Sequence, residues 1–246
     1  MSNQTLDISF KGIYKIENLP ETLKLFHCAQ NKISKIENLP ETLETFLCNF
    51  NSISKIECLP EKLENFYCNS NYISKIEGLP EGLKKLDCGN NSISKIENLP
   101  KSLKTFSCDN TRISKIENLP IGLEMFSCYK TSISKIENLP ISLEMFSCYK
   151  TSISKIENLP LGLIFFYCHN NNIEFVDNVS FHRVNFTLRG YNCIKRIQLR
   201  MKRRYRLKVQ AARVIQKGLY NWLWKPEGIV ARIEKKNLQE SLGMFL

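Results

Sequence analysis

Residues 23–40 read Leu-Lys-Leu-Phe-His-Cys-Ala-Gln-Asn-Lys-Ile-Ser-Lys-Ile-Glu-Asn-Leu-Pro, and most of this pattern returns every twenty residues. Phe26 and Cys28 lie two residues apart, which is typical of a short strand with one buried face. Ile33 and Ile36 follow at a spacing of three, which suits a short return segment that is extended or 3₁₀-like. One such unit cannot bury its own apolar side, so stacked units are expected to share a continuous core. The segment Ile-Ser-Lys-Ile-Glu begins at residues 33, 53, 73, 93, 113, 133 and 153.

The unit resembles the leucine-rich repeat, L-x-x-L-x-L-x-x-N-x-L, with Phe26 and Cys28 in two of the leucine positions. The twenty-residue period and the Leu-Pro-x-x-Leu junction resemble the shortest subclass, found in bacterial effectors and in repeat proteins of giant viruses. The resemblance implies an α/β fold: a right-handed solenoid with a parallel sheet on its concave face and short 3₁₀ or extended segments on its convex face. It also implies a protein that binds other proteins.

We predict a solenoid over residues 1–194 and a basic helical tail over residues 195–246. The solenoid is expected to hold a degenerate N-terminal unit, eight full units from about residue 21, and an irregular closing unit over residues 174–194. Leu6 lies twenty residues before Phe26, and Phe186 lies twenty after Phe166, so the end units should add terminal strands.

Two other columns recur with the same period. Asn31 and its equivalents at 51, 71, 91 and 171 are expected to bond the turns, with weaker turns where Thr111, Thr131 and Thr151 replace them. Eight cysteines from Cys28 to Cys168 are expected to be small, buried, reduced hydrophobes. Since no C-x₂-C spacing occurs, neither a metal nor a cofactor is expected.

Exposed strand positions differ between units, and aromatic and Met side chains gather in the later ones. Such side chains are common at protein contacts. Drift is the alternative, because units 121–140 and 141–160 differ only at Gly122 and Ser142. The candidate residues on the concave face are Tyr67, Lys85, Asp87, Met125, Tyr129, Met145, Tyr149, Phe165, Tyr167 and His169. The columns that begin at Lys35 and Glu37 are interpreted as a solvated edge without a function.

The charge is concentrated in the tail. The whole chain has a net charge of +11, residues 1–176 have −1, and residues 177–246 have +12. Apolar residues at steps of three and four predict an amphipathic basic helix over residues 194–224. Such a helix suits four uses: packing on the end of the solenoid, or binding a nucleic acid, an anionic membrane surface or a calmodulin-like protein. The candidate anion-binding residues are Arg196, Arg200, Arg203, Arg204, Arg206 and Lys208.

Ile215-Gln216 followed by Lys225 is a partial match to the IQ motif, and this resemblance implies the calmodulin-like partner. No catalytic or phosphate-binding motif is visible, so we do not expect an enzyme. Neither a signal peptide nor a transmembrane run is visible, which favours an intracellular protein, in the cytoplasm of a host cell or in a virion if the chain is viral. We therefore expect a monomeric protein-interaction scaffold, with anionic or calmodulin-like binding by the tail as the alternative.

Overall fold

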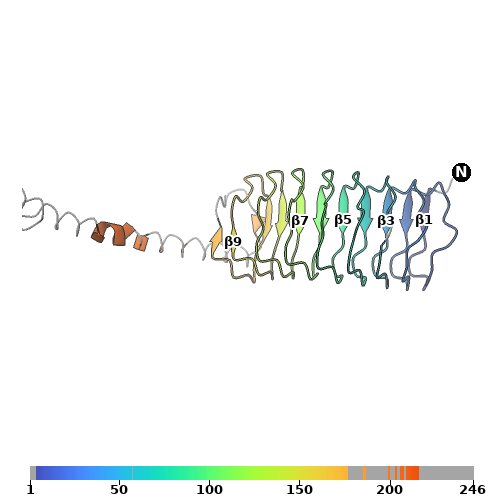
Figure 1. The fold of residues 1–246 in the computed structure, drawn as a ribbon, viewed down its shortest axis with the longest axis horizontal. Coiled ribbons are helices and arrows are strands. Elements are labelled where there is room, and N and C mark those ends of the chain that lie inside the picture. The colour runs from blue at the N-terminus through green and yellow to red at the C-terminus, as the bar shows by residue number, and fades with distance from the viewer. Residues whose placement is uncertain are drawn as a thin grey trace, which may run out of the picture. The chain divides into compact units, whose positions relative to one another are not determined.

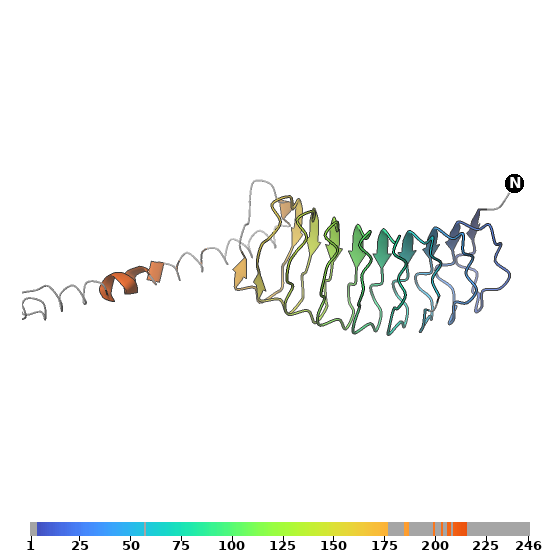
Figure 2. The same cartoon turned by 45° about the horizontal axis from the view of Figure 1, so that its top comes forward.

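The computed structural model describes residues 4–56, 58–176, 185–186, 199, 203, 206–207 and 209–215. The chain divides into two compact units, residues 1–197 and 198–246. The first unit is a solenoid whose successive turns lie side by side from the N-terminus onward (Figure 1). Figure 2 shows that the strands follow one side of this solenoid and the return segments follow the other. We call these two sides the strand face and the back face.

One parallel sheet of ten strands runs along the strand face in sequence order. Each strand pairs with residues twenty positions further on, so Leu6 lies beside Phe26 and Phe166 lies beside Phe186. Each end of the sheet therefore has a terminal strand, β1 at the N-terminal end and β12 at the other. The strands are β1 (Thr5–Asp7), β2 (Leu25–His27), β3 (Thr45–Leu47), β4 (Asn65–Tyr67), β5 (Lys85–Asp87), β6 (Thr105–Ser107), β7 (Met125–Ser127), β8 (Met145–Ser147), β10 (Phe165–Tyr167) and β12 (Asn185–Phe186).

The core consists of columns of the same side chain. Phe26 and Phe46 are fully buried, and their rings stack with centroids 5.5 Å apart. The phenylalanine column continues to Phe166, with Leu86 in the place of one ring. Burying such a column removes a large apolar area from water, which single units cannot achieve. The predicted continuous core is therefore confirmed.

The eight cysteines from Cys28 to Cys168 form a second buried column of reduced thiols. Burial raises the pKa of Cys28 to about 12, and desolvation also raises the pKa values of Cys48 and Cys68. Thiols with such values stay protonated at neutral pH, so this column packs as small hydrophobes.

The described return segments contain no helical turns. Of the two conformations expected from the sequence, extended or 3₁₀-like, they adopt the extended one. Lys35 forms a bridge with Lys55, and β9 (Lys155–Ile156) pairs with β11 (Phe175–Val176). Asn38 and its equivalents have φ near +53°, a left-handed conformation that Asn tolerates better than most residues. Backbone geometry thus explains why Asn recurs there, with Gly78 in one unit.

The asparagine ladder joins neighbouring units. Asn71 Nδ2 donates to the carbonyls of Cys68 in its own unit and Cys48 in the preceding one, both at 3.0 Å. Its Oδ1 accepts from the Ile53 N–H at 3.0 Å. By contrast, Thr131 Oγ1 donates at 2.7 Å to Cys128 of its own unit. Among the described residues, the threonine side chains at 111 and 131 make no bond to the preceding unit.

We predict that Asn71→Thr lowers the free energy of unfolding by about 1–3 kcal/mol, because the Ile53 N–H and the Cys48 carbonyl lose a buried partner. Thr131→Asn, at the matched position in a later unit, should raise it. Equilibrium denaturation of both variants beside the wild type measures these changes. Equal stability of Asn71→Thr and wild type would contradict the structural role of the ladder.

Candidate partner-binding face

The ten residues predicted for partner binding all lie on the strand face or at the strand ends. Seven of them belong to the last three full units: Met125, Tyr129, Met145, Tyr149, Phe165, Tyr167 and His169. Tyr67 lies in β4, and Lys85 and Asp87 lie in β5, so the structure separates these three from the other seven.

Three rings form a stacked ladder two residues beyond the strands. Tyr129 and Tyr149 stack with centroids 4.6 Å apart and planes 4° apart, and Tyr149 and His169 stack at 4.5 Å and 10°. This spacing is close to the ~4.8 Å separation of neighbouring strands, so the sheet itself sets the distance between the rings. Desolvation raises the pKa values of Tyr129 and Tyr149, and Asp109 adds to the rise. Both phenols therefore stay neutral at physiological pH and can donate hydrogen bonds.

Asp109 supports the first ring of the ladder. Its Oδ1 accepts from Ser127 Oγ at 2.6 Å and from the Tyr129 N–H at 2.9 Å, and its Oδ2 accepts from Ser107 Oγ at 3.0 Å. Gly89 lies beside it, where an added Cβ would come within 3.1 Å of the Asp109 carbonyl oxygen. The two turns therefore approach each other closely at this point, and a side chain at position 89 would require the Asp109 backbone to shift by a few tenths of an ångström.

The earlier units have a different, polar surface. Across neighbouring strands, Lys24 pairs with Glu44 at 2.7 Å, and Lys84 pairs with Glu64 at 2.7 Å. The corresponding pair furthest along the solenoid joins Lys104 to Glu124 at 2.9 Å. In the last full unit, the position equivalent to Lys24 is occupied by Ile164, whose exposed fraction is 39%. The strand face thus changes from ion pairs to apolar and aromatic side chains along its length.

One apolar ridge was missed by the sequence reasoning. Ile121, Ile141 and Leu161 lie in the turns before the last three full strands, with exposed fractions of 78%, 82% and 67%. The sequence contains a signal for this ridge, which is the change from charged to apolar residues at one repeat position. The equivalent positions in the earlier units are Glu21, Glu41, Glu61, Glu81 and Lys101. This ridge and the ladder belong to the same three units.

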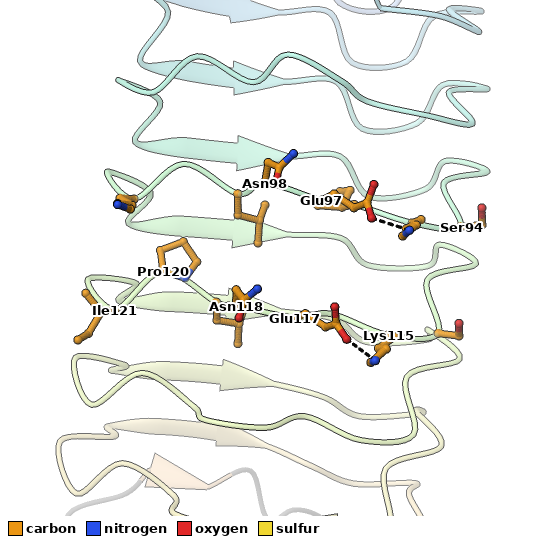
Figure 3. Close-up of a pocket in the computed structure, with 14 residues that line it drawn as sticks. Ser94, Glu97, Asn98, Lys115, Glu117, Asn118, Pro120 and Ile121 are labelled. Atoms are coloured by element: carbon orange, nitrogen blue, oxygen red, sulfur yellow. Dashed lines mark ion pairs between the residues drawn. The ribbon is translucent and has the colours of Figure 1, made fainter.

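The back face contains open grooves between neighbouring units. One of them, with a volume of about 830 Å³, lies between the segments 94–101 and 114–121. Figure 3 shows Glu97 and Glu117 along it, with Lys115 paired to Glu117. Similar grooves follow along adjacent units with the same kinds of lining side chains.

The second unit contains a helix. Residues 209–215 are helical, as are Leu199, Arg203, Arg206 and Leu207 among the described positions. Both arginines are exposed, and so are Leu199 and Leu207. Arg196, Arg200, Arg204 and Lys208 lie outside the described residues, as do Gln216 and Lys225 of the IQ-like pattern.

Within the described part of the chain, no group of three or more His, Cys, Asp or Glu side chains is placed to hold a metal ion. No helix in that part is long and apolar enough to cross a membrane.

Solved structures with the same fold are leucine-rich-repeat proteins. YopM from Yersinia enterocolitica WA-314 aligns with 71% of this chain at a TM-score of 0.68 and 22% identity, and this chain covers 39% of YopM. A Shigella effector leucine-rich-repeat domain aligns with a TM-score of 0.56 and 21% sequence identity, and the alignment covers 61% of this chain and 70% of that domain. A functional domain of InlJ from Listeria monocytogenes aligns with a TM-score of 0.56 and 20% sequence identity, and the alignment covers 71% of this chain and 43% of that one. That domain is described as including a cysteine ladder.

The sequence has no significant match to a protein-family model or to a curated protein. The solenoid therefore has the leucine-rich-repeat fold, as the sequence predicted, and spans about two fifths of the length of the YopM chain.

We predict opposite pH effects for two aspartates. Burial raises the pKa of Asp109, and Asp87 contributes, so the folded state holds a proton that the unfolded chain releases near its ordinary value of 3.8. The associated stability is present below that value and is lost as pH rises through the folded pKa. Asp109→Asn should therefore gain stability relative to the wild type between about pH 3 and pH 7.

The matched control is Asp7→Asn. Hydrogen bonds from Ser9 lower the pKa of Asp7, so its contribution is present above 3.8 and lost as pH falls. This variant should lose stability relative to the wild type over the same interval. Denaturation midpoints at both pH values measure the two trends, and a pH-independent difference for Asp109→Asn would be inconsistent with its raised pKa.

Proposed function

We propose that this chain is a non-enzymatic interaction scaffold that binds a protein partner on the strand face of its last three full units. The observation that carries the proposal is the stacked ladder of Tyr129, Tyr149 and His169. Aromatic side chains that are already held in place lose little conformational freedom on binding, which favours affinity. Met125 and Phe165, each about two fifths exposed, extend the apolar contact area beside the ladder.

The polar groups around the ladder favour a specific contact over a non-specific hydrophobic one. The two neutral phenols can donate hydrogen bonds to a partner, and Lys130 and Lys150 follow them in the chain as exposed cations. An apolar centre with a polar rim is the usual composition of a protein interface. Tyr67, Lys85 and Asp87 would extend the same contact toward the earlier units.

The thiol column favours a reducing compartment. Eight buried reduced cysteines persist most readily where thiols are kept reduced, which supports an intracellular location for the scaffold. The Shigella effector domain among the structural neighbours is compatible with such a role.

We predict that the combined variant Tyr129→Ala, Tyr149→Ala and Tyr167→Ala weakens partner binding at least tenfold. The physical reason is that truncating central aromatic anchors removes most of the binding energy of a typical interface. Proteins captured by the wild-type chain are first identified, and their affinities for the variant are then measured by titration.

The control removes equally large aromatic side chains elsewhere. Tyr14, Phe50 and Tyr72 are exposed by 66%, 52% and 66%, and none lies in a strand. Their combined replacement by Ala should leave the affinity unchanged. Partners that bind the strand-face variant as tightly as the wild type would exclude this face as the binding site.

A second candidate function belongs to the basic helix. Arg203, Arg206 and Arg213 are exposed on it, and residues 177–246 carry a net charge of +12. We propose that this helix binds an anionic partner, either a nucleic acid, an anionic membrane surface or an acidic calmodulin-like protein.

We predict that replacing Arg196, Arg200, Arg203, Arg204, Arg206 and Lys208 by Gln lowers the salt concentration that elutes the chain from heparin. Fewer cationic contacts also reduce the salt dependence of binding to duplex DNA. Replacing six exposed basic residues of the solenoid that lie outside the back-face lysine column (Lys11, Lys24, Lys32, Lys62, Lys101 and Arg112) by Gln is the control for net charge. If both variants elute alike, total charge rather than the helix governs binding.

A further inference from the structure

The two faces of the solenoid differ in how much their exposed residues vary. The position that begins at Leu25 on the strand face reads Leu, Thr, Asn, Lys, Thr, Met, Met and Phe in successive units. On the back face, the positions that begin at Ser34, Lys35 and Glu37 are identical in seven units, and Lys15 and Glu17 extend two of these columns. If the units arose by duplication, exposed positions on both faces had the same time to diverge. Something therefore constrains the back face.

The fold itself does not supply this constraint. Ile33 and Ile36 are retained as core residues, and Asn38 as a left-handed turn residue. The charged side chains between them have no such role. In the seven described pairs, the lysine side chains are 54–74% exposed and the glutamate side chains 49–69% exposed. Exposed pairs of this kind add little to the stability of a single chain.

The pairs form two continuous charged columns. Lys95 and Glu97 are 2.5 Å apart within one unit, and each following unit repeats this pair. Neighbouring units also influence one another, because Glu137 raises the pKa of Lys115 in addition to the larger effect of Glu117. A column of lysines therefore runs beside a column of glutamates along the solenoid, and Figure 3 shows two successive pairs.

We infer that the back face is a dimerisation surface whose occupant is a second copy of this chain. Two copies face each other about a twofold axis parallel to the solenoid axis. This operation places the lysine column of each copy on the glutamate column of the other, unit for unit. A twofold axis across the solenoid would instead place lysine on lysine. The charge pattern thus selects a parallel, in-register dimer in which the same patch serves both copies.

The size of the surface is adequate for such a contact. Eight units at the ~4.8 Å strand spacing make a stripe about 38 Å long, and six extended residues make it about 20 Å wide. Two copies would bury about 1,500 Å² in total, which lies within the usual range for specific interfaces. This dimer departs from the monomer expected from the sequence and leaves the strand face of each copy open.

Charge reversal on the full-length chain tests the dimer. In one variant, Lys75, Lys95, Lys115 and Lys135 become Glu; in the other, Glu77, Glu97, Glu117 and Glu137 become Lys. Sedimentation equilibrium should give twice the chain mass of 28.6 kDa for the wild type at low salt, and the monomer mass at about 1 M salt, where charges are screened beyond about 3 Å. Each variant alone should sediment as a monomer.

Mixing the two variants in equal amounts should restore the dimer, because opposite columns then face each other. Native mass spectrometry with one variant isotopically labelled identifies the heterodimer, and circular dichroism establishes that each variant is folded. Replacing Glu21, Glu41, Glu61 and Glu81 by Lys, at exposed turns, gives a control with the same charge change that should still dimerise. A monomeric wild type, dimers of either reversed variant alone, or a mixture that stays monomeric would each overturn the inference.

Discussion

Every part of the solenoid depends on the register between strands twenty residues apart. Because Phe26 lies beside Phe46 and Cys28 beside Cys48, each inward side chain must fit the one in the next unit. The pleat that fixes these residues inside directs their neighbours outward at the same spacing. A core selected for uniformity therefore also sets the distance between exposed side chains, and the stacking of Tyr129 on Tyr149 follows from it. Binding geometry is in this sense a by-product of core geometry.

The inward half of the structure could be predicted from sequence because its period is strict. The sheet, its register, the two terminal strands at Leu6 and Phe186, and the buried thiols all follow from a twenty-residue step. The outward half could not be predicted in the same way. The hydrogen bonds that Asp109 accepts depend on the distances between side chains in neighbouring units. The space beside Gly89 depends on the same distances. The sequence shows the change from Glu to Ile that begins at Ile121, but the exposure of a turn side chain depends on how the turns pack in three dimensions. The predicted tail residues Arg196, Arg200, Arg204 and Lys208 fall outside the described residues.

Exposed side chains vary between units on the strand face and repeat between units on the back face. Side chains on the strand face change from ion pairs such as Lys24 with Glu44 to the aromatic ladder, as expected for a surface that recognises one particular protein. The back face keeps one charged pair in unit after unit, as expected for a surface that meets a copy of itself. These assignments are compatible because the core lies between them. A dimer through the back faces would present two strand faces, so a partner with two sites would be bound with increased avidity.

The distribution of the asparagine ladder has a mechanical consequence. Asn51, Asn71 and Asn91 tie each early unit to the one before it through side-chain bonds, whereas Thr111 and Thr131 bond within their own units. We therefore expect uneven stiffness along the solenoid, with a braced first half, a more compliant region around Thr111 and Thr131, and a further brace at Asn171, which bonds the Cys148 carbonyl of the preceding unit. Local opening needs less free energy where fewer bonds cross between units. The spacing between the units around Thr111 and Thr131, which lead into the aromatic ladder, is thus expected to change at a lower free-energy cost than the spacing between the earlier units.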